Sequence, residues 1–128
     1  MDCLRHATRM ALLVLMTAAA AHAEEPRAIP AGDAARGQGL YQACSGCHSI
    51  DENDVGPRHR GVLGRRAGSL PDYHYSQALR DSHIVWDAAS LDRWLTSPQA
   101  LVPGTKMFFS LPDAQMRADI IAYLAQQK

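Results

Sequence analysis

The stretch Cys44-Ser45-Gly46-Cys47-His48 decides how this chain of 128 residues is interpreted. Two cysteines separated by two residues and followed at once by a histidine form the attachment signature for a c-type haem. Thiols at this spacing, near the end of a helix, reach the two vinyl groups on one edge of a porphyrin. The imidazole that follows then falls beneath the iron. The motif therefore predicts haem bonded covalently to Cys44 and Cys47, with His48 as an axial ligand of the iron.

Two other uses of a Cys-x-x-Cys pair fit the rest of the sequence less well. A redox-active dithiol of the thioredoxin type expects a strand before the pair and a βαβ setting, and the sequence has neither. A zinc knuckle needs a second set of thiol or imidazole ligands at matching spacing. The one further cysteine, Cys3, lies in a segment that we expect to be removed. Haem attachment therefore remains the preferred interpretation.

Residues 1–23 have the order of a secretory signal peptide. Basic residues come first, then the apolar run 10–21, then the small-residue pattern Ala21-His22-Ala23. A retained membrane anchor is the alternative, but the apolar run is about a dozen residues long and a span needs roughly 20. We expect cleavage after Ala23, a periplasmic location and no membrane span in the mature chain.

The charge balance excludes some partners. The whole chain has 13 basic and 13 acidic residues, and of these Asp2, Arg5 and Arg9 lie in the signal segment. The mature chain is therefore close to neutral, which gives no support to nucleic-acid binding. With two cysteines left, no conventional disulfide framework is available. A covalently held cofactor would stabilise so small a domain in its place.

The rest of the chain predicts an all-α domain with long loops. Residues 24–32 are expected to form a flexible N-terminal lead and residues 33–128 the domain. Helices are expected at about 33–46, 75–80 and 88–96, with a last helix that has Pro112 in its first turn. The segments 49–73 and 97–110 are rich in glycine and proline. A loop of the first segment's length is unusual unless it wraps something, and a buried prosthetic group is the natural candidate.

The second axial position is open to methionine, histidine, lysine or nothing. Outside the signal segment the methionines are Met107 and Met116. Met116 has the spacing of a core residue in the last helix, with Ile120, Ile121, Tyr123 and Leu124. Met107 lies in a loop rich in proline and glycine, where a side chain can be aimed freely. This placement favours Met107.

The segment Val102-Pro103-Gly104-Thr105-Lys106-Met107 closely resembles the methionine-ligand loop of class I cytochromes c. The resemblance runs from about Asp33 to Ala125, with the segments in the family's order. It implies the class I cytochrome c fold, with three main helices, short helices and long loops wrapped around one haem, and His48 and Met107 as axial pair. It also implies a monomeric one-electron carrier, not an enzyme, that docks transiently with redox proteins at the exposed haem edge.

The resemblance assigns roles to further residues. The carbonyl of Pro57 would accept a hydrogen bond from the proximal imidazole, and Arg65 would lie close to a haem propionate. Tyr75 and Trp86 would hydrogen-bond to propionates. The first and last helices would cross closely, with Gly37, Leu40 and Tyr41 against Ile120, Ile121 and Tyr123.

The sequence departs from the mitochondrial pattern at three places. Trp94 stands where that protein has a tyrosine near the methionine sulfur, and an indole donates a hydrogen bond but accepts none. His59 replaces an apolar residue, and we expect it to be an exposed loop histidine. Most lysines around the haem edge are missing, with Lys106 remaining, so the identity of the partners is not carried over.

Three alternatives to a diffusing carrier stay open: a haem subunit of a dehydrogenase or oxidase, a small peroxidase, and a gas-binding sensor in which Met107 is labile. A peroxidase is disfavoured because the predicted distal loop has Thr105 and Lys106 but no histidine or carboxylate nearby. An apolar patch of Val102, Phe108 and Phe109 is expected near the haem edge.

Overall fold

The computed structural model describes residues 28–128, so the expected signal peptide lies outside the described residues. The elements are α1 (Ala34–Leu40), η1 (Tyr41–Ala43), α2 (Gln77–Asp81), α3 (Ala88–Thr96), α4 (Pro98–Leu101) and α5 (Ala114–Gln126). Within residues 28–128 the one strand-like pairing is an isolated bridge between Arg66 and Val85. The predicted all-α class is therefore confirmed. No helix in this part of the chain has the length and apolar character needed to cross a bilayer.

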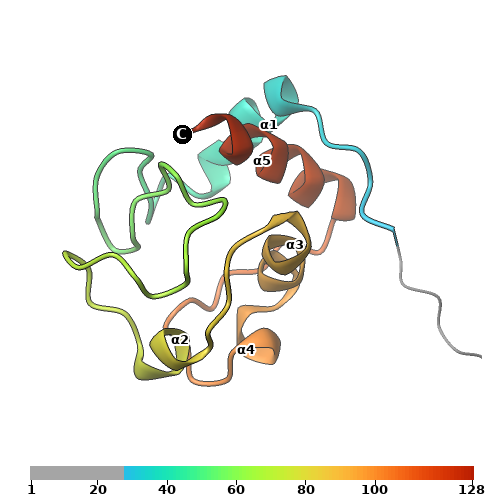
Figure 1. Cartoon of the computed structure of the whole chain (residues 1–128). Helices are drawn as coiled ribbons and strands as arrows, with labels where there is room; N and C mark the ends of the chain where they lie inside the picture. Colours follow the sequence, from blue (N-terminus) through green and yellow to red (C-terminus); the bar gives the residue numbers. More distant parts are fainter. Residues whose placement is uncertain (1–27) are drawn as a thin grey trace, which may run out of the picture.

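Helices α1 and α5 cross closely, as the upper part of Figure 1 shows. The crossing depends on Gly37, because a Cβ added there would lie 1.9 Å from the backbone oxygen of Asp119. Only a residue without a side chain lets the two backbones come so near. One turn later, the rings of Tyr41 and Tyr123 pack with their centroids 5.4 Å apart. The expected crossing of the first and last helices is thus present.

The start of α1 is fixed to α5 by the buried carboxylate of Asp119. It accepts hydrogen bonds from the backbone N–H of Asp33 at 2.7 Å and from Nε and Nη2 of Arg36, both at 2.9 Å. Just before α1, the carbonyl of Ala31 accepts a hydrogen bond from the side chain of Gln115 at 2.8 Å. The end of the expected N-terminal lead therefore contacts the last helix.

Helix α3 has the bounds that the sequence predicts. Asp87 accepts a hydrogen bond from the backbone N–H of Ser90, and the Ser90 side chain accepts one from the backbone N–H of Asp87. This capping box fixes the first turn. The other end of the helix is set by Pro98, which cannot continue it.

A buried arginine joins α3 to α5. Nε of Arg117 donates to Asp92 at 2.7 Å, and Nη1 donates to the carbonyls of Leu111 and Pro112 at 2.8 and 2.9 Å. The sequence pattern did not indicate a charged residue inside the domain at this position. Because every partner is within hydrogen-bonding distance, the guanidinium is satisfied although it is buried.

The boundaries of α1, α2 and α5 differ from the sequence prediction, and one further helix is present. Helix α2 spans Gln77–Asp81 instead of 75–80. Helix α1 ends at Leu40, and the chain tightens into η1 instead of continuing to residue 46. Helix α5 begins after Asp113, whose side chain caps it, so Pro112 precedes the helix instead of lying in its first turn. Helix α4 was not predicted. It forms because Ser97 caps a turn whose first residue is Pro98, the position where a missing N–H costs nothing.

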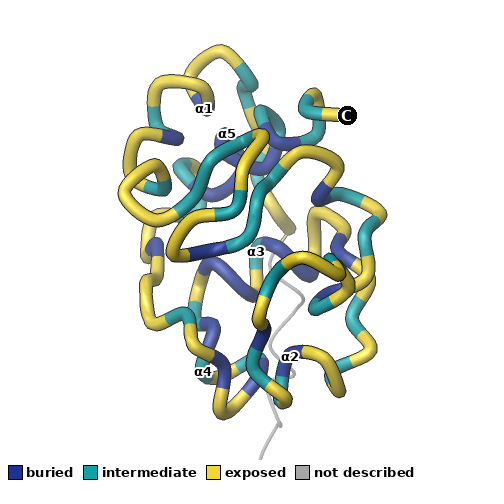
Figure 2. Tube along the Cα trace, turned by 90° about the vertical axis from the view of Figure 1, so that its left-hand side faces the viewer, coloured by how far each residue is buried: buried dark blue, intermediate teal, exposed yellow. Residues whose placement is uncertain are grey.

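The long segment 49–76 is a structured loop, drawn in green on the left of Figure 1. Hydrogen bonds tie it to the rest of the domain, including Gly61 N–H to the carbonyl of Gln127 at 2.7 Å and Gly64 N–H to that of Trp86 at 2.7 Å. Val62, Ala67 and Tyr75 are buried along this segment, between exposed and half-buried residues, and such alternation is seen over much of the trace in Figure 2. The loop therefore places some side chains in the interior and leaves others at the surface.

Candidate haem site

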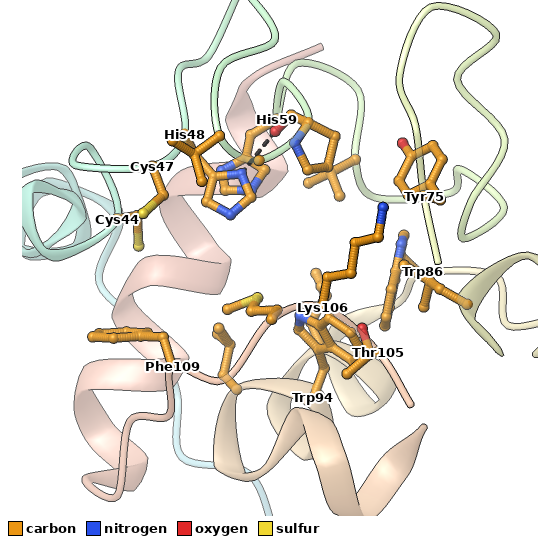
Figure 3. A pocket seen from close by; sticks show the side chains of 18 of the residues that line it. Cys44, Cys47, His48, His59, Tyr75, Trp86, Trp94, Thr105, Lys106 and Phe109 are labelled. Atoms are coloured by element: carbon orange, nitrogen blue, oxygen red, sulfur yellow. Dashed lines mark hydrogen bonds between the residues drawn. The ribbon is translucent and has the colours of Figure 1, made fainter. Parts of the chain in front are cut away.

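A cavity of about 470 Å³ lies between the long loop, helices α3 and α5 and the segment that precedes α5 (Figure 3). Its size falls in the range of sites that hold small molecules and cofactors. It is lined by all nine residues that the sequence assigns to a haem site: Cys44, Cys47, His48, Pro57, Arg65, Tyr75, Trp86, Trp94 and Met107. Residues that are far apart in the sequence thus face one space.

The two thiols lie at one side of this cavity (Figure 3). The chain turns through the motif after η1, with hydrogen bonds from the N–H groups of Cys47 and His48 to the carbonyl of Cys44 at 3.1 and 2.9 Å. Neither cysteine is in a disulfide. Cys44 is half-buried and Cys47 is exposed, and burial raises the pKa of the Cys44 thiol to about 11. The thiol of Cys44 therefore stays protonated at neutral pH.

The His48 imidazole is held with one nitrogen free. Nδ1–H donates to the carbonyl of Pro57 at 2.7 Å, as the sequence resemblance implies. Burial is the main influence on this ring and lowers its pKa, so it is neutral at pH 7 with a lone pair on Nε2. The neighbouring Gly56 is required, because a Cβ there would lie 2.2 Å from Cε1 of the ring. An imidazole oriented by a carbonyl at one nitrogen is a typical metal ligand.

Arg65 places a positive charge in the cavity wall. Its guanidinium donates to the carbonyls of Arg60 and Arg58 at 3.1 and 2.8 Å. No carboxylate within residues 28–128 forms an ion pair with it. Burial lowers the pKa of Arg65 from its usual value, because removal from water disfavours the charged form of the guanidinium. An anionic group in the cavity would compensate this charge.

The loop that carries Met107 is fastened by a glutamine of α4. The side-chain amide of Gln99 donates to the carbonyl of Thr105 at 2.8 Å and to that of Met107 at 3.2 Å. Met107 is half-buried and lines the cavity. Trp86 and Trp94 line the same cavity, and the centroids of their rings lie 5.2 Å apart. This role of Gln99 was not predicted from the sequence.

Two expectations from the sequence are wrong. His59 is not exposed: it is half-buried, lines the cavity and stacks on His48, because the loop folds back over the proximal side. Val102 does not belong to the surface patch, because it is buried with 5% exposed. Val55, 70% exposed, lines the cavity mouth with Phe108 and Phe109, which are 78% and 45% exposed.

The residues of this cavity fit a haem. Aromatic and aliphatic side chains make most of its wall, which also contains two thiols, one imidazole and one thioether, the groups that covalent attachment and axial ligation use. A bare metal ion fits poorly, because the described residues hold no group of three or more His, Cys, Asp and Glu that could bind one. A porphyrin would supply the remaining ligands.

Comparison with known proteins gives a consistent picture. The family model for cytochrome c matches residues 34–128. Cytochrome c2 of Rhodomicrobium vannielii is 44% identical over 104 residues, which cover 78% of this chain and 83% of that protein. Cytochrome c of Euglena viridis is 45% identical over 101 residues, covering 76% and 99%. The structure of cytochrome cH from Methylobacterium extorquens superposes with a TM-score of 0.71 at 45% identity, covering 73% and 98%.

These similarities extend over nearly the whole described part of the chain, including every segment that lines the cavity. Cytochromes c are electron-transfer proteins and not enzymes, and their cofactor is covalently bound haem c. On this evidence the chain belongs to the cytochrome c family.

Proposed function

We propose that this chain is a periplasmic one-electron carrier with a single haem c, attached through Cys44 and Cys47 and ligated by His48 and Met107. One observation carries the proposal: a single cavity has both thiols, the imidazole and the thioether in its wall. With both axial positions filled by protein side chains, substrate has no site on the iron. When bound, the haem supplies a reversible one-electron change of its iron.

The protein would control this change through its axial ligands and the cavity wall. The hydrogen bond from His48 to Pro57 holds Nδ1 of the imidazole and makes the ring a stronger base. Gln99 holds the backbone on both sides of Lys106, which keeps Met107 in place. Axial methionine favours the ferrous state, so the midpoint potential should be positive relative to a bis-histidine haem.

The far wall of the cavity is suited to the propionates. Arg65 would compensate their charge, and Tyr75 and Trp86, both buried and cavity-lining, would donate hydrogen bonds from the polar tips of their rings (Figure 3). Trp94 would pack near the methionine sulfur, since both residues line the same space. With these assignments, Arg65, Tyr75 and Trp86 would hold the propionates on the inner side of the cavity, and Cys44 and Cys47 would hold the haem by its other edge.

Electron exchange would take place at that mouth. The side chains that both line the cavity and are exposed are Ala43, Cys47, Val55, Lys106, Phe108 and Phe109, of which only Lys106 is charged. Redox partners would dock here briefly, because electron-transfer contacts lie at the small end of interface sizes. The chain itself would act as a monomer. The signal-like segment 1–23 supports export.

The absorption spectrum of the oxidised protein tests this proposal. Axial methionine gives a sulfur-to-iron charge-transfer band, which we expect in the wild type. M107L should abolish the band, whereas M116L, a matched change at a half-buried methionine of α5, should keep it. A high-spin ferric spectrum in the wild type would contradict the carrier and favour a peroxidase or a gas-binding sensor.

A further inference from the structure

His59 contacts the proximal ligand His48, and Tyr41 contacts His59; the sequence indicated neither contact. The rings of His59 and His48 stack with their centroids 4.1 Å apart and their planes inclined by 21° (Figure 3). The hydroxyl of Tyr41 lies 2.9 Å from Nδ1 of His59. Three aromatic side chains from two segments of the chain are therefore connected in a row that ends at the expected iron ligand.

The direction of the hydrogen bond follows from the chemistry of the two groups. An imidazole nitrogen is a stronger base than a phenol oxygen, so we assign Tyr41 as donor and Nδ1 of His59 as acceptor. Tyr41 is buried and His59 is half-buried, so this hydrogen bond orients the two rings relative to one another.

Two hydrogen bonds hold the backbone of His59 in place, which limits the positions that its ring can take. Its N–H donates to the carbonyl of Ser49 at 2.9 Å, and its carbonyl accepts from the N–H of Val62 at 2.9 Å. Tyr41 is held just as firmly, since it is 7% exposed and packs edge-on against His59 and on Tyr123 of α5. An aliphatic residue at position 59 would fill the space without fixing an orientation. The His59 ring, held at Nδ1 by the Tyr41 hydroxyl, instead presents its face to His48 in one fixed orientation.

We propose that His59, held by Tyr41, is a positioning residue for the axial ligand: its ring sets the plane of the His48 imidazole. The hydrogen bond to Pro57 fixes Nδ1 of His48 but leaves rotation about that contact. The stacked face of His59 removes this rotation. The inference rests on the proposed haem ligation, because the plane of His48 has a functional meaning only relative to a bound haem.

Proton NMR of the oxidised haem protein tests this role. In low-spin ferric haem the shifts of the four haem methyl groups depend on the orientation of the axial imidazole plane. We expect H59L to change their pattern, Y41F to change it in the same direction by less, and the double variant to match H59L. Y123F is the matched control, because Tyr123 touches Tyr41 but does not line the cavity. It should keep the wild-type pattern.

The outcomes separate the two proposals. Mass spectrometry first establishes covalent haem. A chain without haem would contradict the proposed cofactor and, with it, any role of His59 toward it. A haem-loaded H59L protein with the wild-type methyl pattern would overturn the positioning role alone. If H59L fails to fold, Y41F decides the question, since it removes a single oxygen atom: an unchanged pattern in Y41F overturns the proposal.

Discussion

Arg36 binds Asp119 with two parallel hydrogen bonds of 2.9 Å, Nε to Oδ2 and Nη2 to Oδ1, and so joins the first helix to the last. These bonds and the N–H of Asp33 lower the pKa of the Asp119 carboxyl to about 2, from an ordinary value of 3.8. Because the folded pKa is depressed, the contact stabilises the fold fully above the unfolded pKa. Its contribution is lost as the pH falls from about 4 toward 2.

Acid unfolding should reveal this carboxylate. We expect D119N to lower the melting temperature at pH 7, and to show a smaller further loss than the wild type between pH 5 and pH 2. The matched control is D81N, which changes an exposed carboxylate on α2 and should follow the wild-type curve. Parallel curves for D119N and the wild type would show that Asp119 does not carry the pH dependence.

Gly37 should be intolerant of a side chain. G37A places a Cβ where the backbone oxygen of Asp119 lies 1.9 Å away, and because neither backbone can move freely, the helices must separate. Overpacking of this kind costs about 1–3 kcal/mol of unfolding free energy. G39A is the control on the same helix, where a Cβ meets no atom within 4 Å, and should be neutral or stabilising by about 0.5–1 kcal/mol. Urea unfolding distinguishes them; equal effects would contradict the close crossing.

Arg117 should be costly to remove although it touches no part of the cavity. R117M leaves the Asp92 carboxylate and the carbonyls of Leu111 and Pro112 without their donor. Breaking a buried ion pair on one side costs about 3–5 kcal/mol. R93M, at an exposed arginine of α3, should cost little. Denaturant midpoints test the difference, and a stable R117M protein would mean that the pair is dispensable.

The parts of this molecule that could be predicted from sequence are those fixed by local chemistry. The ends of α3 follow from Asp87 and Pro98, and the haem motif needs only five consecutive residues. Each of these features is determined within one turn or one loop.

The parts that could not be predicted depend on contacts between distant segments. His59 is polar and lies among glycines and prolines, where a solvated side chain is the usual outcome. Only the folding of the loop onto Ser49 brings it against His48. Arg117 and Asp119 alternate with apolar residues in α5, and no periodicity indicates that both are buried. Their partners are 25 and 83 residues away along the chain.

Gln99 should control how readily Met107 leaves the iron. Q99L removes the two hydrogen bonds to the carbonyls of Thr105 and Met107, each worth about 1 kcal/mol. The loop should open more often, and added imidazole should bind the ferric haem up to about thirtyfold more tightly, the factor that corresponds to about 2 kcal/mol. Q38L, at an exposed glutamine of α1, is the control. Spectral titration gives both affinities; equal values for Q99L and the wild type would show that this amide does not hold the ligand.

Lys106 should account for the charge dependence of electron exchange at the cavity mouth. It is the one charged side chain among the exposed lining residues, and Nζ is fixed near the rim by a hydrogen bond to the carbonyl of His74 at 3.1 Å. Ferricyanide, an anion, should therefore oxidise the ferrous protein about threefold more slowly in K106Q at low ionic strength, and at the same rate near 1 M salt, where the Debye length is about 3 Å. K128Q removes the other lysine of the chain, which does not line the cavity, and should behave as the wild type. Stopped-flow rates across this salt range test the assignment. An equal slowing in both variants would show that overall charge, and not the rim of this cavity, attracts the reagent.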